Sequence, residues 1–315
     1  GKGDGQRKSV VGKGRGGNEG GSEGGTVEDC DVLLRSRCTL KKLVAVNATV
    51  TPLQRAALEG TMLEAFLEYC DIVMERQLTL ALIRCWVRRW KAFRIAGRRV
   101  LFSVFDVALF TGLPATGRRV ELDGEEVESD VGIAFRARVA EWEAEEMGRR
   151  VPGKSGKKRR FFRNYVGAMV ALCEEYSSDD GVGVWRKLYA FMVLSGVLFP
   201  RTPYGAAWNL LQYVEDIDTM GEYAWAEAVW RVLVETIEDT QRKLCEGPIS
   251  EVQLNGFCVL IQVWFYEHTT RYGKQDKKRY PRLASWDRVD HGGRYDANLL
   301  LKDIREDEVI RRICR

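Results

Sequence analysis

The sequence predicts an all-α protein: a single multi-helix globular domain with a small β-hairpin flap and a disordered, glycine-rich N-terminal tail. Apolar residues recur at helical spacing through most of the 315-residue chain. Nine Trp, twelve Phe and eleven Tyr supply large side chains for a core, and 45% of the residues are hydrophobic. A chain of this length and composition buries a substantial core.

Residues 1–28 are the predicted tail. They are rich in glycine, which loses the most backbone entropy on ordering, and few apolar side chains offset that loss. Tails rich in arginine and glycine bind RNA, but only Arg7 and Arg15 contribute arginine here, so a plain linker is favoured. The helical domain is predicted to occupy residues 29–315.

The first half of this domain carries two clear helix signals. Thr51 is placed as an N-cap, with Pro52 at the first helical position. A helix is also predicted from Leu78 to Ile95, ended by Gly97. Its large apolar residues and its cations occupy separate faces, namely Leu82, Trp86, Trp90 and Phe93 against Arg84, Arg88 and Lys91. The cations are interpreted as a solvated helix face, with a contribution to a basic surface as the alternative.

Strand signals are few and short. Arg98–Leu101 is predicted to be a strand. The β-hairpin flap is placed at 118–128, where Arg119–Leu122 and Glu125–Val127 alternate on either side of Asp123-Gly124.

Helices account for most of the remaining chain. They are predicted at 102–113 before a Gly-Leu-Pro turn, at 132–147, at Trp185–Phe199 before Pro200, around Trp225, around Trp264, and near the C-terminus. Residues 148–160 are interpreted as a mobile basic loop. The predicted core residues are Phe105, Leu109, Leu113, Trp225, Trp230, Trp264 and Phe265.

Four stretches carry a resemblance to a known family: FDVALFTGLPATGRRV at 105–120, LYAFMVLSGVLFPRT at 188–202, LLQYVEDIDTMGEYAWAEAVW at 210–230, and NGFCVLIQVWFYEHTTRY at 255–272 with YPRLASW at 280–286. In order and spacing they resemble the plant mobile domain group, over about residues 75–290. The branch most similar occurs beside SUMO-protease-like domains in plant transposon-derived reading frames. The resemblance implies an all-helical fold, a nuclear setting, a link to transposable elements or their silencing, and no catalytic residues.

Positive charge concentrates in the predicted loop although the net charge is only +4. Lys and Arg on a loop can neutralise phosphates without reading sequence, and the neighbouring Phe161, Phe162 and Tyr165 could stack on bases. The alternative is a solvated loop with the two Phe in the core. A second cluster lies at 274–282. The candidate nucleic-acid-binding residues are Arg149, Arg150, Lys154, Lys157, Lys158, Arg159, Arg160, Arg163, Lys277, Lys278 and Arg279.

Gly148–Ser155 matches the P-loop pattern G-x-x-x-x-G-K-[ST]. A P-loop needs a strand before it and a helix opening after it, so that backbone amides converge on phosphate. A charged helix precedes this match and more Lys and Arg follow it, so we interpret it as a chance match in a basic loop.

Other chemistry is disfavoured. The carboxylates of Glu215, Asp216 and Asp218 are adjacent but lack a further ligand at metal spacing, and the group at 287–296 is interpreted in the same way. Cys–His catalysis would need His268 or His291, and His268 is interpreted as a helix end. The eight scattered Cys are expected to be reduced thiols. We therefore expect no enzyme, cofactor or metal.

No secretory signal and no run of eighteen uncharged apolar residues is present, so no membrane partner is expected. The sequence predicts a non-catalytic nuclear interaction module of transposon-derived type that associates with DNA or RNA through the basic loop. The alternative is a protein-recruitment module that accepts a nuclear protein partner in a groove and makes no nucleic-acid contact.

Overall fold

The computed structural model describes residues 32–38, 40–148, 165–200, 208–272, 279–286 and 296–310. Helices predominate, as predicted, but two small sheets lie among them. The all-α prediction is therefore correct for most of the described chain and incomplete for the sheets.

The α-helices are α1 (Leu40–Asn47), α2 (Pro52–Leu58), α3 (Arg76–Arg84), α4 (Val104–Thr111), α5 (Asp130–Gly148), α6 (Tyr165–Glu175), α7 (Val182–Met192), α8 (Leu211–Val214), α9 (Trp225–Glu246), α10 (Val259–Glu267) and α11 (Ala297–Asp303). Short 3₁₀-helices occupy Glu64–Glu68, Arg88–Trp90, Asp179–Gly181, Trp208–Leu210, Ile217–Glu222, Thr270–Tyr272, Arg282–Ser285 and Glu306–Glu308. A π-helical segment, Val193–Leu198, continues α7.

The strands form two separate sheets. β1 (Leu33–Ser36) and β5 (Glu251–Leu254) pair in parallel, which joins the start of the described chain to the segment after α9. β2 (Trp86–Val87), β3 (Ala92–Ile95) and β4 (Arg98–Leu101) form an antiparallel sheet in sequence order.

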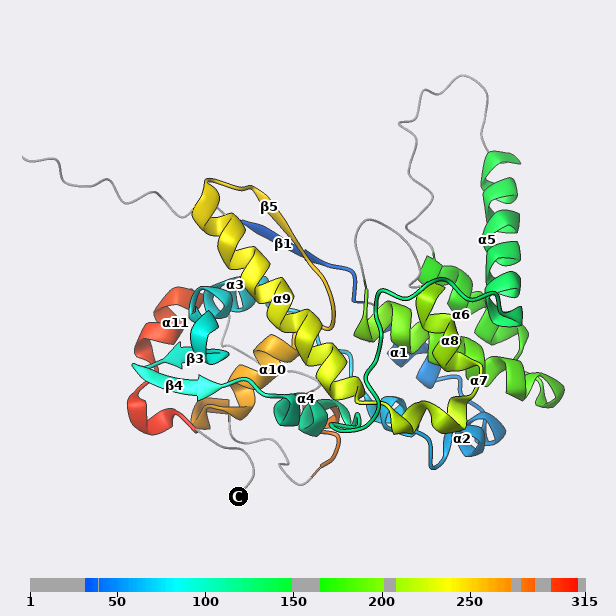
Figure 1. The fold of residues 1–315 in the computed structure, drawn as a ribbon, viewed down its shortest axis with the longest axis horizontal. Helices are drawn as coiled ribbons and strands as arrows, with labels where there is room; N and C mark the ends of the chain where they lie inside the picture. The colour runs from blue at the N-terminus through cyan, green and yellow to red at the C-terminus, as the bar shows by residue number, and fades with distance from the viewer. Residues whose placement is uncertain are drawn as a thin grey trace, which may run out of the picture.

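The long helix α9 lies between two groups of elements (Figure 1). The three-stranded sheet, α3, α10 and α11 lie on one side of it, and α1, α2 and α5 to α8 lie towards the other. One hydrophobic cluster links buried residues from Leu34 to Ile304. Burial of such surface is the main favourable term in folding.

Local sequence explains where two helices begin. Thr51 caps α2 through its side chain, and Gln54 returns a hydrogen bond to the Thr51 amide. Ser103 and Asp106 form the same reciprocal box at the start of α4. Helix α4 ends at Gly112, whose φ of 78° is a conformation that glycine adopts freely. Both the predicted cap at Thr51 and the predicted stop at the Gly-Leu-Pro turn are confirmed.

The apolar stretch before Pro200 is helical, as predicted, and most of its side chains are buried. The segment Asp179–Leu198 is long and apolar enough to cross a membrane by length and composition, yet 72% of its most apolar window is buried inside the protein. A helix that is apolar on all sides is expected in a protein core.

The predicted helix from Leu78 to Ile95 is wrong beyond Arg84. There the chain turns into the antiparallel sheet, in which Trp86 is paired with Phe93. Phe93 packs against Trp264 with ring centroids 4.3 Å apart, so the aromatic spacing that resembled a helix stripe instead serves a buried sheet face. Gly97 does not end a helix. With Ala96 it forms the β3–β4 turn, both residues having positive φ as hairpin turns require.

The predicted hairpin flap at 118–128 is also wrong. No strand forms there, although Val120 and Leu122 alternate into the core as expected. Side chains from helices replace the partner strand: Tyr213 bonds the Glu121 backbone, and Arg231 donates to the Val120 carbonyl at 2.9 Å. The alternating pattern correctly predicts which side chains point into the core, but the segment packs against helices and not against a second strand.

Four of the seven predicted core residues are buried, namely Leu113, Trp225, Trp264 and Phe265. Leu109 and Trp230 are half-buried. Phe105 is wrong, because 74% of it is exposed. Helix α4 packs through Val107 and Phe110, and Phe105 lies outside that face.

Candidate functional site

Exposed arginines occur on the 3₁₀-helix before β3 and on β3 and β4. Together with Trp90 they form what we call the arginine surface: Arg89, Trp90, Arg94 and Arg99. Arg94 and Arg99 face each other directly in the strand register. Their guanidinium carbons lie 5.9 Å and 4.0 Å from the centroid of the Trp90 ring. Both distances are within the range of cation–π attraction.

The described residues supply no countercharge to the arginine surface. Arg89, Arg94 and Arg99 are exposed, and none of them pairs with a carboxylate in the part of the chain that the structure describes. Like charges directly opposite on neighbouring strands repel, and stacking on the Trp90 indole offsets part of that repulsion. An anion bound beside the two arginines would reduce the remaining repulsion.

Neighbouring cations have a different role, because they hold the sheet in place. Glu238 on α9 accepts hydrogen bonds from the Trp86 indole at 3.4 Å and from Lys91, and it pairs with Arg88 at 3.0 Å. Arg98 pairs with Glu306 near the C-terminus. These contacts fix the hairpin against α9 and leave the arginine surface available to a ligand.

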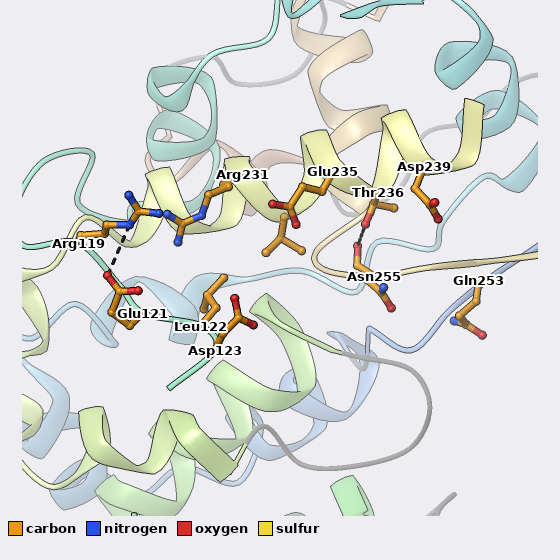
Figure 2. A pocket seen from close by; sticks show the side chains of 11 residues that line it. Arg119, Glu121, Leu122, Asp123, Arg231, Glu235, Thr236, Asp239, Gln253 and Asn255 are labelled. Atoms are coloured by element: carbon orange, nitrogen blue, oxygen red, sulfur yellow. Dashed lines mark hydrogen bonds and ion pairs between the residues drawn. The ribbon is translucent and has the colours of Figure 1, made fainter. Parts of the chain in front are cut away.

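A polar cavity of about 440 Å³ lies along an adjoining face of α9 (Figure 2). One wall is a stripe of α9, the other is the extended segment 119–123, and Gln253 and Asn255 close one end. Its charged lining comprises the carboxylates of Glu121, Asp123, Glu235 and Asp239 and the guanidinium groups of Arg119 and Arg231.

Most charges of the cavity are already engaged. Arg231 donates to the Val120 carbonyl and lies 3.6 Å from Glu227, and Arg119 lies 3.5 Å from Glu121. Partial burial raises the pKa of Asp239, but hydrogen bonds from Lys243 and Arg242 outweigh it and leave the pKa below its usual value. Glu235 is exposed and makes no ion pair within the described ranges. Within the described ranges, Glu235 is therefore the lining carboxylate that has no ion pair.

The YPRLASW segment supplies a buried polar cluster. Glu267, at the end of α10, accepts from Arg282 Nε at 2.9 Å and from the Trp286 indole at 2.7 Å. Arg282 and Glu267 are almost fully buried. The cluster fixes a loop to α10, and Arg282, which the sequence places in the second basic cluster, is not available to a ligand.

His268 ends α10, as predicted. Its ring contacts the Ile310 carbonyl at 2.7 Å, and its Nε2 lies 3.5 Å from Asp106. The Ile310 amide also donates to the His268 carbonyl, so the residue holds the C-terminal segment.

The cysteines that the structure describes are free thiols: Cys38, Cys70, Cys85, Cys173, Cys245 and Cys258. Burial raises the pKa of Cys38 and of Cys173 to about 12. Such thiols stay protonated and are poor nucleophiles.

Most of the predicted nucleic-acid-binding residues lie outside the described residues: Arg149, Arg150, Lys154, Lys157, Lys158, Arg159, Arg160, Arg163, Lys277 and Lys278. Arg279 is described, and it pairs with Glu68 at 3.2 Å. Gly148, the first residue of the P-loop match, ends α5, so a helix precedes the match as the sequence indicated.

The two candidate metal groups are accounted for differently. Glu215 pairs with Lys187 at 2.8 Å and Asp218 with Arg186 at 2.6 Å, which makes them part of a charged turn. Asp296 caps α11, and 287–295 lie outside the described residues. Among the residues that the structure describes, no cluster of His, Cys, Asp and Glu could hold a metal ion.

Sequence reasoning missed the arginine surface because it places Trp90 and Arg94 in a helix and Arg99 in a separate strand. The available signal was Ala96-Gly97, a turn between two short runs in which Arg94 and Arg99 take the outward positions.

Comparison with known protein sequences gives matches that span the four quoted stretches. Over 252 residues the chain is 22% identical to Protein MAINTENANCE OF MERISTEMS from Arabidopsis thaliana, a match that covers 79% of this chain and 49% of that relative. The chain thus spans about half the length of this curated relative. No solved structure matches it. The family model for the plant mobile domain matches residues 62–308, and the chain therefore belongs to the plant mobile domain family.

Proposed function

We propose that this plant mobile domain is a non-catalytic nuclear interaction module, related to plant transposons, that associates with nucleic acid. The observation that carries the proposal is the pair Arg94 and Arg99, opposed across two strands and both lying over the Trp90 ring without a carboxylate partner in the described chain. We place the contact on the arginine surface, to which the predicted basic loop would add.

Phosphodiester backbones match the chemistry of this surface. Guanidinium groups bind phosphate oxygens in a bidentate manner, so Arg94 and Arg99 on the hairpin, with the exposed Arg89 before it, can contact phosphates. The half-buried Trp90 adds a ring on which a base can stack. Glu238 and Glu306 hold the neighbouring cations, so the hairpin that carries this surface is positioned before a ligand arrives.

The absence of catalysis is part of the proposal. In the polar cavity, partial burial raises the pKa of Asp239, but hydrogen bonds from Lys243 and Arg242 outweigh it and leave the pKa below its usual value. Catalytic acids and bases usually have a pKa displaced towards neutrality by burial or by like charges. Neither this cavity nor the protonated buried thiols supports a reacting group.

The test is equilibrium binding of labelled single-stranded and duplex oligonucleotides between about 50 and about 200 mM salt. With three phosphate contacts, log K should fall against log salt with a slope of about −2 to −3. Replacing both Arg94 and Arg99 by Gln should reduce the slope by about 2. The matched control is Arg76→Gln, an exposed arginine on α3 that lies outside the surface. Binding that the double variant leaves unchanged would contradict the placement, and salt-independent or absent binding would contradict the proposal.

A second candidate function, recruitment of a protein partner, is favoured by the polar cavity. The exposed Glu235 carboxylate, which has no ion pair within the described ranges, suits a Lys- or Arg-bearing segment of a polypeptide. A lysine-rich peptide should bind with Glu235 intact and lose most affinity in Glu235→Lys. The control is Glu59→Lys, which reverses the charge of an exposed carboxylate outside the cavity. Equal binding to both variants would remove this candidate.

A further inference from the structure

Arg94 and Arg99 concentrate two positive charges at a single point of the arginine surface. The Arg94 amide donates to the Cys85 carbonyl at 2.9 Å, which turns its backbone groups away from β4. Arg94 and Arg99 are therefore a non-hydrogen-bonded pair of the β3–β4 ladder, the kind in which opposed side chains lie closest. Both side chains are exposed, so a ligand can reach the two cations together from solvent.

Trp90 orders this pair before a ligand arrives. The Arg99 guanidinium carbon lies 4.0 Å from the centroid of the indole and that of Arg94 lies 5.9 Å from it, so both groups are held beside one ring. An arginine that binds an anion loses rotamer freedom, and stacking on a ring removes part of that cost beforehand. The pair is therefore a preorganised double cation.

The charge of the pair indicates which phosphate group fits it. A phosphodiester carries one negative charge and would leave one of the two cations uncompensated. Two phosphodiesters brought to the same point would repel each other. A phosphomonoester carries a charge of about −1.5 to −2 at neutral pH and offers three acceptor oxygens, which two guanidinium groups can share. A single phosphomonoester therefore matches the pair best.

Phosphomonoesters occur at the ends of nucleic-acid chains and on phosphorylated protein side chains. The surroundings of the pair favour the nucleic-acid end. Arg89, exposed on the 3₁₀-helix before β3, supplies a further cation for the next phosphate. The base at a chain end has one face without a neighbouring base, so it can stack on the half-buried Trp90 without first being unstacked. A phosphorylated side chain brings neither a second phosphate nor a base.

We propose that Arg94 and Arg99 bind the terminal phosphomonoester of a nucleic-acid chain, with Arg89 on the following phosphate and the terminal base against Trp90. This inference rests on the proposed nucleic-acid function and specifies the group that the arginine surface recognises. It predicts that the end of an oligonucleotide binds more tightly than its interior.

The experiment is equilibrium binding of single-stranded oligonucleotides to the full chain at about 50 mM salt, with a dye on an internal base. One sequence is prepared with a 5′-phosphate, with a 3′-phosphate and with hydroxyl groups at both ends. A hydroxyl-ended oligonucleotide longer by two nucleotides matches the charge of the phosphorylated ones. A terminal phosphate should raise affinity about tenfold over this charge-matched control. The end at which the gain occurs identifies the source of the phosphomonoester.

Three exposed arginines give matched variants. Arg94→Gln and Arg99→Gln should each abolish the preference for the phosphorylated end. Arg89→Gln should weaken all the oligonucleotides by a similar factor and retain the preference. Unchanged circular dichroism establishes that each variant is folded.

Equal affinity for the phosphorylated and charge-matched oligonucleotides would overturn this inference and leave the proposed nucleic-acid function intact. Absent binding of every oligonucleotide would overturn both. A preference retained in Arg94→Gln and in Arg99→Gln would show that the end binds elsewhere. A phosphoserine peptide that binds as tightly as the phosphorylated oligonucleotides would assign the pair to a phosphorylated protein instead, which also overturns the inference.

Discussion

The two adjoining faces of α9 handle charge in opposite ways. On the face towards the three-stranded sheet, Glu238 is mostly buried and engages an indole and two cations. On the face towards the polar cavity, Glu235 is exposed and makes no ion pair within the described ranges. The same residue type, three positions apart, is structural in one place and available to a ligand in the other. Sequence spacing alone does not separate the two, because residues three apart are neighbours on a helix.

The largest expected effect tests this contrast directly. Glu238→Ala should lower the free energy of unfolding by about 1–3 kcal/mol, because it leaves the Trp86 indole and two cations without their acceptor. Glu235→Ala should change it by less than about 0.5 kcal/mol, as expected for an exposed residue without partners. Urea denaturation of both variants measures the difference. Equal losses would show that the two faces are not distinct.

The sequence predicted the helical elements well wherever a local device marks them. The cap at Thr51, the stop at Gly112 and the apolar stretch before Pro200 each have a short-range cause, and all three are found. The prediction of secondary structure was wrong where a segment packs against residues that are distant in the sequence. Trp86, Trp90 and Phe93 fit a helix stripe, and only contacts with residues such as Trp264, far along the chain, select the sheet.

The candidate sites show the same difference between features that local sequence marks and features that depend on distant contacts. The clusters that the sequence made conspicuous are runs of consecutive cations, and most of them fall outside the described residues. The arginine surface has no such run, because Trp90, Arg94 and Arg99 converge only once the hairpin has formed.

The next expected effect separates stacking from charge on the sheet side of the comparison. Trp90→Leu should weaken single-stranded binding about tenfold, because stacking on an aromatic ring contributes roughly 1–3 kcal/mol per base. It should leave the salt dependence unchanged, since no cation is removed. Binding isotherms at several salt concentrations check both statements. A reduced salt slope would mean that Trp90 acts mainly by positioning Arg94 and Arg99.

A smaller effect concerns cross-talk between the two faces. Glu235→Lys removes the unpaired carboxylate of the cavity and adds a cation to a chain that already carries a net charge of +4. Nucleic-acid affinity should rise by no more than about threefold at moderate salt, because exposed charges beyond a Debye length of roughly 8–10 Å are screened. The salt slope measured beside Glu59→Lys gives the comparison. A larger gain, specific to Glu235→Lys, would mean that the cavity and the arginine surface contact the same nucleic acid.

The smallest effect lies at the end of the cavity wall, where Asp239 is held by Lys243 and Arg242. Its pKa is lower in the folded state, so its contribution is present above the carboxylate's ordinary pKa and is lost as the pH falls through the lower, folded value. The pairs are largely exposed, which limits the contribution to about 0.3–0.5 kcal/mol. Asp239→Asn should therefore reduce the free energy of unfolding slightly at neutral pH and not at all in strong acid. A difference that persisted in acid would show that Asp239 supports the wall by packing rather than by charge, in contrast to the exposed carboxylate of Glu235 one turn before it.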